Sequence, residues 1–469
     1  MRFSIALPAT AAMLLLGGCN SLDVGDLNAP GVSETQNNPT RVGVLSLASG
    51  LQIGSRFGQG QQNGFNVLLG ITGRELYNFD PADPRFVTEM VVGPLDGGSP
   101  AFGGNLFSQG YTDIRTANIL LRAMGKLSDT PPGGMSPAEK EATLAYAQTL
   151  VALDLLRVID TRDDNGAPTD VDIDPSGTPA PIKTKAEVFQ HIVNLLDSAA
   201  VHLQTVGDAP FPFEMSQGYA GFDRTLTFLK FNRALRARVA VYLDDWAGAL
   251  TALSASFFDT TKPFSLGVYH TFSTAPGDST NSLFDPNARA LVAHPSLQTD
   301  AQLQVGGLLP DKRFVDKTIP LASPHTSQGL SSSQALNVYR SPSDPVPVIR
   351  NEELILLHAE ASIGLNDLAT ALSDINLVRQ TAGNLPALGS FADQTAARTE
   401  LLYNKRYSLL FEGGHRWIDL RHYGLLNTLP QEVTGAGTAK RFSRFPFPTN
   451  ECLARNPQPA KGCGLEAGS

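Results

Sequence analysis

Apolar residues recur at helical spacing through most of the chain after residue 108. In the first such segment Ile114, Ala117, Leu121 and Met124 fall at positions i, i+3, i+7 and i+10, which places them on one face of a helix. Polar residues occupy the positions between them. The pattern predicts a helix that packs against neighbours along one side.

The same period predicts helical hairpins over about 108–160, 183–254 and 350–424. In the first of them Ser136 is followed by Pro and, three positions on, by Glu, which is a typical helix N-terminal signature. We therefore expect a mainly α fold.

Two segments share the pattern L-[DN]-D-[WL]-A-x-A-L. They are LDDWAGAL at 243–250 and LNDLATAL at 365–372, and each follows an Ala-rich helical stretch. A helix, a tight polar turn and a second helix with small packing residues are typical of a tetratricopeptide hairpin. The copies lie 122 residues apart, so the hairpins do not form a tandem array. We expect a tetratricopeptide-like superhelix that carries an insertion.

Two long regions lack helical periodicity. Residues 56–107 are Gly-rich with scattered aromatics, and residues 255–345 are rich in Ser, Thr, Pro and Gly. Irregular stretches of this length inside a domain are usually functional, and loops on a rigid scaffold commonly carry recognition. We expect short strands and ordered loops that form a ligand-binding face.

The N-terminal sequence has the features of an export signal. Residues 1–18 contain Arg2 and then an apolar run that is too short for a permanent membrane span. Leu-Gly-Gly before Cys19 resembles a bacterial lipobox, which predicts cleavage before Cys19 and its lipidation. The alternative is an ordinary secretory signal. Residues 19–39 are polar and predict a flexible tether, and residues 40–469 form the domain.

Composition narrows the function. Hydrophobic content of 42% and charged content of 17% over 469 residues indicate a globular protein. A net charge of −9 without basic runs argues against nucleic acid as a partner. Cys452 and Cys463 are candidates for a disulfide in an exported protein, although free thiols remain an alternative. No further Cys or nearby His completes a metal site with them.

The segment 401–424 concentrates charge in an apolar-rich setting. Its ionisable residues include Lys405, Arg406, Glu412, His415, Arg416, Asp419, Arg421 and His422. A hydrolase needs two positioned carboxylates or a nucleophile with its base, and no Ser or Cys nucleophile stands here. The Gly pair at 413–414 predicts a helix break. We interpret the charges as structural, with Arg416 paired with Asp419 or with Glu360.

Several blocks together resemble the SusD/RagB family of outer-membrane nutrient-binding lipoproteins. They are the lipobox, YTDIRTAN at 111–118 with the helix after it, 228–250, 350–379, 401–424 and FPFP at 445–448. The residues that carry the resemblance as structural motifs are Glu360, Arg379, Arg406, Glu412, Arg416, Trp417 and Asp419. Asn404 and Ser408 depart from it, because the family pattern has Glu at both positions.

The resemblance implies a non-catalytic protein on the cell surface, anchored by lipid in the outer membrane. It implies capture of an oligosaccharide or a peptide and delivery to a SusC-like TonB-dependent transporter. Two alternatives stay open, a protein-binding tetratricopeptide scaffold and a secreted glycosidase.

Sugar binding calls for aromatic side chains that stack on C–H faces beside polar side chains. Trp246 and Trp417 are the only Trp residues and are expected in the core, so a platform must come from loop Tyr and Phe. Our candidates are, from the first irregular region, Arg74, Tyr77, Phe79 and Asn105, and from the insertion, Tyr269, Phe284 and Tyr339.

The acidic loop DTRDDNGAPTDVD imperfectly resembles a calcium loop. Counting from its Gly places Thr161, Asp163, Asn165 and Asp172 at ligand positions, but the first residue is not acidic and the last is Asp in place of Glu. A solvated turn or a looser structural calcium site are the two interpretations. No other cofactor is expected.

Overall fold

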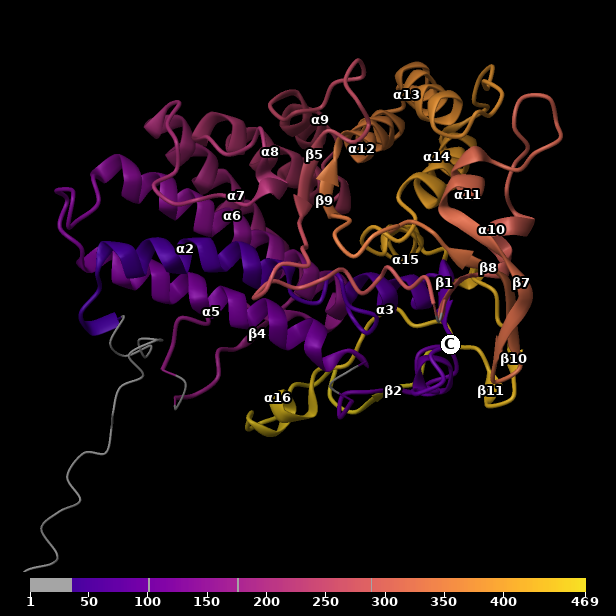
Figure 1. Ribbon diagram of the computed structural model, residues 1–469, viewed down its shortest axis with the longest axis horizontal. Helices are drawn as coiled ribbons and strands as arrows, with labels where there is room; N and C mark the ends of the chain where they lie inside the picture. The colour runs from indigo at the N-terminus through magenta and orange to yellow at the C-terminus, as the bar shows by residue number, and fades with distance from the viewer. Residues whose placement is uncertain (1–35, 100–101, 175–176, 288) are drawn as a thin grey trace, which may run out of the picture.

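Helices form most of the computed structural model, which describes residues 36–99, 102–174, 177–287 and 289–469 (Figure 1). The long helices are α2 (Arg41–Arg56), α5 (Gly104–Lys126), α6 (Pro137–Arg162), α7 (Lys185–Val206), α8 (Thr225–Tyr242), α9 (Trp246–Ser254), α12 (Asn351–Gly364), α13 (Leu368–Thr381), α14 (Gln394–Ser408) and α15 (His415–His422). The short helices are α3 (Phe65–Thr72), α4 (Arg85–Thr88), α10 (Pro295–Thr299), α11 (Lys312–Lys317) and α16 (Thr449–Leu453), with 3-10 turns η2 (Asp163–Asn165), η3 (Gln217–Tyr219) and η4 (Leu426–Thr428).

The strands are short. They are β1 (Leu76–Asn78), β2 (Leu95–Asp96), β3 (Ala167–Pro168), β4 (Ile182–Lys183), β5 (Gly267–His270), β6 (Leu291–Ala293), β7 (Thr318–Ser327), β8 (Leu330–Leu336), β9 (Val346–Arg350), β10 (Val433–Thr434), β11 (Gly437–Thr438) and β12 (Leu465–Glu466).

Capping residues fix where α6 begins. The Ser136 side chain accepts a hydrogen bond from the Glu139 amide, and the Glu139 carboxylate accepts one from the Ser136 amide, with Pro137 at the first helical position. This capping box confirms the start predicted from the sequence. The stretch Pro137–Asn165 is apolar and long enough to cross a membrane by composition, but 78% of its most apolar window is buried inside the protein. It is a core helix of the helical layer.

The two sequence repeats stack directly on each other. Asp245 caps α9 through the Gly248 amide, and Asp367 caps α13 through the Thr370 amide, so both hairpins turn in the same way. The Trp246 ring lies against Gly364, where a Cβ atom would approach the ring to 2.3 Å. Residues far apart in sequence thus form neighbouring hairpins. The predicted mainly helical, tetratricopeptide-like fold is confirmed.

The two irregular regions meet in one antiparallel sheet. Its strand order is β1-β6-β8-β7, in which β1 comes from the first region and the other three strands come from the insertion. Tyr77 pairs with Val292 across β1 and β6. Figure 1 shows the sheet at the end of the molecule opposite α2, and α12–α14 lie above it. The sheet therefore joins both loop regions to the helical scaffold.

The sheet and the chain around it have a hydrophobic core of their own. Trp417 is fully buried there and donates from Nε1 to the Phe442 carbonyl at 2.7 Å. Trp246 is half-buried and packs against the core of the helical layer. Both Trp residues contribute to cores, as the sequence predicted.

The segment 401–424 breaks at the predicted glycines. Helix α14 ends at Ser408 and α15 begins at His415, after Gly414 has adopted a left-handed conformation at φ 70°. The predicted partner of Arg416 was wrong. Lys405 lies between Glu360 and Asp419 at 2.9 and 2.7 Å, and Arg416 instead donates to the Gly73 carbonyl at 2.9 Å. Because Lys405 already satisfies both carboxylates, Arg416 turns toward the chain that leads into β1.

The departures Asn404 and Ser408 also have a structural explanation. The Arg313 guanidinium donates to Asn404 Oδ1 and to Ser408 Oγ, each at 3.0 Å. Asp311 already neutralises Arg313 through an ion pair at 2.6 Å. Neutral acceptors therefore suffice at the two positions where the family pattern has Glu.

The remaining motif residues hold elements together by ion pairs. Arg406 pairs with Asp300 at 2.7 Å and Arg379 pairs with Glu400 at 3.1 Å, while Glu412 accepts from Arg350 at 2.6 Å. At the C-terminus, Cys452 and Cys463 form a disulfide that ties α16 to the last residues of the chain.

Candidate functional site

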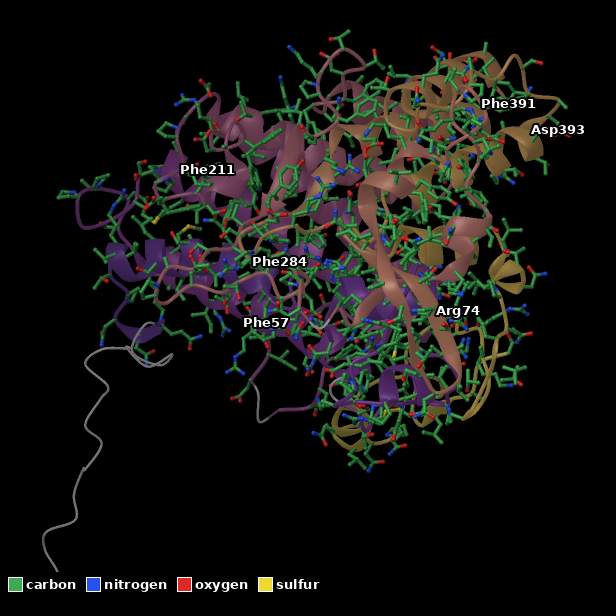
Figure 2. The ribbon with its side chains drawn as sticks, turned by 45° about the vertical axis from the view of Figure 1, so that its right-hand side comes forward. Phe57, Arg74, Phe211, Phe284, Phe391 and Asp393 are labelled. Carbon is green, nitrogen blue, oxygen red and sulfur yellow. A yellow bond between two sulfur atoms is a disulfide. The ribbon has the colours of Figure 1, made fainter. Side chains whose placement is uncertain are left out.

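Four of the seven predicted ligand-contact residues lie in the core. Arg74, Tyr77, Phe79 and Tyr339 are between 0% and 7% exposed, and Figure 2 marks Arg74 among closely packed side chains near the sheet. The prediction of Arg74, Tyr77 and Phe79 as ligand contacts is corrected, because these side chains are enclosed and line neither of the two large cavities. Tyr339 is also mostly enclosed, but it lines the cavity of about 500 Å³ beside the insertion. The loops fold back on the sheet and their aromatics fill its core.

Each of these four side chains has an internal role. Arg74 donates to Glu432 at 3.3 Å and to the Lys440 carbonyl at 2.8 Å. The Tyr77 and Phe79 rings stack with centroids 5.4 Å apart. The Tyr339 hydroxyl donates to the Phe411 carbonyl at 3.0 Å.

The other three predicted residues are half-buried and do not converge on one site. Phe284 packs against the core of the sheet. Tyr269 lines a cavity of about 500 Å³ beside the insertion. Asn105 lines a larger groove of about 870 Å³ on the helical side. Both volumes fall in the range of small-molecule sites, and we consider the larger groove first.

One face of α5 forms the floor of this groove, which we call the α5 groove. Its lining residues on that face recur every three or four positions: Gly104, Ser108, Tyr111, Arg115, Asn118 and Arg122. The opposite face of α5 carries the buried apolar residues, such as Ile114 and Ala117. The amphipathic helix therefore presents a polar row to an open space.

The two other walls come from distant parts of the chain. One wall consists of Pro168, residues 171–174 and residues 179–180, and the other consists of the residues around α16. Arg455 joins these walls, since it donates to the Ala180 carbonyl at 2.5 Å and pairs with Glu451. The disulfide of Cys452 holds the α16 wall, so the groove is a built feature of the fold.

Three polar side chains in the α5 groove have no internal partner. Among the residues that the structure describes, Asn105, Arg115 and Asn118 form no side-chain hydrogen bond or ion pair. Polar groups that line a cavity and remain unpaired are free to bind water or a ligand. The groove thus offers two amides and one guanidinium to an incoming molecule.

Tyr111 adds an aromatic surface. Its hydroxyl donates to the Pro168 carbonyl at 2.7 Å, and its ring lies 4.6 Å from that of Phe107. Burial raises the pKa of Tyr111 well above its usual value, so the hydroxyl stays protonated. An aromatic ring beside amides and a guanidinium suits a polyhydroxylated ligand, whose C–H face is apolar and whose hydroxyls need hydrogen bonds.

The charged segment 401–424 does not form a comparable site. His415 is buried against a cavity of only about 40 Å³, which is too small for a sugar. Burial lowers the pKa of His415 to about 4, so the imidazole is neutral at pH 7. Its neighbour Asp419 is bound by Lys405. These groups satisfy one another and do not face the α5 groove.

The residues at the suspected calcium-ligand positions form hydrogen bonds or ion pairs with other groups of the protein. Asp163 pairs with Lys185 at 2.5 Å, Asn165 donates to the Phe445 carbonyl at 3.1 Å, and Asp172 pairs with Arg122 at 2.7 Å. Thr161 donates to the Val158 carbonyl within α6. Within the described ranges, no group of three or more His, Cys, Asp or Glu residues is placed to hold a metal ion.

The sequence missed the groove residues Tyr111, Arg115, Asn118 and Arg455. The first three lie in the block YTDIRTAN at 111–118. The spacing of its apolar residues predicted a buried helix face, but its polar residues look the same whether they face solvent or a binding groove. Arg455 reaches the groove through the path of the C-terminal chain, which no local sequence pattern predicts.

The fold defines a class, a tetratricopeptide-like helical scaffold with an inserted sheet. Residues 331–454 match the family model of the SusD family. No curated protein sequence matches the chain. The match bears out, over these residues, the resemblance to the SusD/RagB family drawn from the sequence motifs.

Solved structures share the fold over most of their length. A SusD superfamily protein from Bacteroides vulgatus is 14% identical with a TM-score of 0.63, covering 91% of this chain and 98% of that one. A SusD-like carbohydrate binding protein from Bacteroides fragilis is 15% identical with a TM-score of 0.66, covering 85% and 89%. Surface glycan-binding protein A from Bacteroides uniformis is 15% identical with a TM-score of 0.65, covering 90% and 99%.

Proposed function

We propose that this protein is a cell-surface glycan-binding protein that captures an oligosaccharide in the α5 groove. The observation that carries the proposal is the row of unpartnered polar side chains, Asn105, Arg115 and Asn118, beside the Tyr111 ring in a cavity of about 870 Å³. Amides and a guanidinium bind sugar hydroxyls by paired hydrogen bonds, and an aromatic ring receives the apolar face. Two structural neighbours are described as carbohydrate- or glycan-binding, which supports this ligand class.

The proposal includes delivery to a SusC-like TonB-dependent transporter of the outer membrane, which is what the resemblance to the SusD/RagB family suggests. Lipidation at Cys19 would hold the protein at the membrane surface. Cys19, the signal 1–18 and most of the tether 19–39 lie outside the described residues. Cys19→Ser is expected to release the protein from the membrane fraction. Affinity purification of the lipidated form is expected to recover a barrel transporter.

Binding is tested by calorimetry with a panel of neutral and acidic oligosaccharides. We expect the double variant Asn105→Ala/Arg115→Ala to lose at least about tenfold in affinity, since it removes hydrogen bonds worth roughly 1 kcal/mol each. Lys230→Ala is a matched control, because Lys230 is exposed on α8 away from the groove. Unchanged affinity in the double variant would refute the groove as the site. If only peptides bind in the calorimeter, the ligand class is peptides and not glycans.

The same protein variants distinguish the proposed function from the two alternatives, a secreted glycosidase and a protein-binding scaffold. A secreted glycosidase would release reducing sugar from the panel, whereas the proposed function predicts binding without turnover. A pure protein-binding scaffold would bind its partner equally well in the groove variant. The structural calcium ion remains a prediction, and melting with and without a chelator tests it.

A further inference from the structure

The α5 groove runs lengthwise along the helix that forms its floor. Its lining residues on α5 extend from Gly104 to Arg122, a distance of about 27 Å along the helix axis. In Figure 1, α5 is the long helix at the lower left of the molecule, and α16 lies below it. The groove therefore offers far more length than a single sugar ring needs.

The two walls accompany different halves of α5. Near the start of the helix, the Phe107 ring packs against Phe447 with centroids 5.7 Å apart, and Thr449 lines the groove just beyond. Near the end of the helix, Arg122 pairs with Asp172 of the other wall at 2.7 Å. Both halves of the helix thus have a wall beside them, and a ligand can contact the floor along the whole row.

The hydroxyl side chains of the floor are already used within α5. The Ser108 and Thr112 hydroxyls each donate to the backbone carbonyl four positions earlier, at 3.2 and 3.0 Å. Their hydrogens are therefore not available to a ligand. Within the described residues, the free donors of the floor are the amides of Asn105 and Asn118 and the guanidinium of Arg115.

These free groups are spread along the helix and do not converge on one point. Asn105 and Asn118 are about 20 Å apart along the axis of α5, and Tyr111 stands between them on the same lining row. A site for one small ligand gathers a few convergent polar groups around it. A ligand that meets Asn105, then Tyr111 and then Asn118 has to be a chain that lies along α5.

The wall beside Tyr111 favours a sugar chain over an extended peptide. A peptide commonly binds as an added strand, which needs free backbone groups at a strand edge. Pro168 of β3 lies on this wall, has no amide hydrogen, and accepts from the Tyr111 hydroxyl through its carbonyl at 2.7 Å. The groups that this wall and the floor present are an aromatic ring and side-chain donors, which suit sugar rings and hydroxyls.

We propose that the α5 groove binds a linear oligosaccharide lengthwise. An inner sugar unit lies against Tyr111, and the chain contacts Asn105 on one side and Arg115 and Asn118 on the other. The inference rests on the proposed function and adds the shape and the minimum length of the ligand. A disaccharide has only two rings and cannot span the distance of about 20 Å between the two amides. Affinity therefore rises with chain length until both amides are engaged, and then levels off.

The test is calorimetric titration with one glycan from the panel, prepared in lengths from the disaccharide to the octasaccharide. The wild-type protein should bind the hexasaccharide at least about tenfold more tightly than the disaccharide, because the longer chain makes hydrogen bonds that the shorter one cannot. The hexasaccharide and the octasaccharide should bind equally well.

Two single variants locate the ends of the bound chain. Asn105→Ala and Asn118→Ala should each weaken hexasaccharide binding about fivefold, and the double variant about 25-fold, since positions this far apart act independently. The disaccharide should lose affinity in at most one of the single variants. Lys230→Ala, on the exposed side of α8, should change neither affinity. Unchanged melting temperatures of the variants exclude misfolding as the cause.

The inference and the proposed function fail in different ways. Equal affinities for the disaccharide and the hexasaccharide, both weakened by Arg115→Ala, would overturn lengthwise binding and leave the proposed function standing. A loss of hexasaccharide affinity in only one of the two asparagine variants would also overturn it, because the chain would then occupy only half of the groove. The absence of glycan binding at every length refutes both proposals.

Discussion

The segment 401–424 and the α5 groove differ in how their polar side chains are used. In the former, Lys405 is bound by Glu360 and Asp419, and Glu412 is bound by Arg350. In the latter, Arg115 and its neighbouring amides have no internal partner in the described chain. A dense cluster of charge is therefore no sign of function when its members satisfy one another. A sparse row of unpaired groups beside open space is the better indicator of binding.

The largest effect is expected from the buried network. Lys405→Met leaves Glu360 and Asp419 buried together without a cation, which typically costs about 3–5 kcal/mol. Burial alone would lower the pKa of Lys405, but Asp419 and Glu360 together raise it, so the native side chain is charged. Urea denaturation measures the loss against Lys230→Ala. A change below about 1 kcal/mol would mean that the pairing contributes little.

The next effect concerns the turn that separates α14 from α15. Gly414→Ala places a Cβ atom 2.3 Å from Leu69 at a positive φ, so we expect a loss of at least about 2 kcal/mol. Gly424→Ala is the matched control, since Gly424 has φ 66° but open space around it. It should cost only the conformational strain, about 1 kcal/mol. Equal losses in both variants would show that packing against Leu69 is unimportant.

A smaller, pH-dependent effect is expected at Glu75. Burial raises the pKa of Glu75 to about 8, although Arg416 and Arg406 oppose the shift. The folded state therefore holds a proton that the unfolded state releases near pH 4.3, and stability falls as the pH rises from about 4.3 to about 8. Glu75→Gln removes this dependence and should add at least about 1 kcal/mol at pH 8. An unchanged pH slope between the variant and the wild type would contradict the assignment.

The smallest effect on stability is expected at the rim of the groove. Arg122 and Asp172 pair at 2.7 Å, but both side chains are about half exposed. Arg122→Ala should change the free energy of unfolding by less than about 1 kcal/mol. The glycan affinity of Arg122→Ala, measured by calorimetry, should fall less from the wild-type value than that of Arg115→Ala, because Arg122 is already paired with Asp172. A larger fall in affinity would move the binding site toward the rim.

Much of the scaffold could be predicted from the sequence. The helical period, the capping residues at Ser136 and the Gly pair at 413–414 act locally, so the pattern of neighbouring residues determines the outcome. The repeat at 243–250 and 365–372 also indicated the hairpin class, because a capping Asp and small residues mark each turn.

The binding residues could not be predicted in the same way. A loop aromatic that fills a core and one that faces a ligand have the same local sequence, and Tyr77 and Phe79 proved to be core. Their burial follows from the pairing of β1 with β6, which lies more than 200 residues further along the chain. Likewise, the competition between Lys405 and Arg416 for Asp419 depends on helix packing that local spacing does not reveal.

The most direct test is a crystal structure of the protein with an oligosaccharide from the panel that binds it in solution. The account predicts sugar density in the α5 groove, with hydrogen bonds from Asn105, Arg115 or Asn118 and a ring against Tyr111. Sugar bound only on another face, with the groove filled by water, would contradict the assignment of the groove as the glycan-binding site.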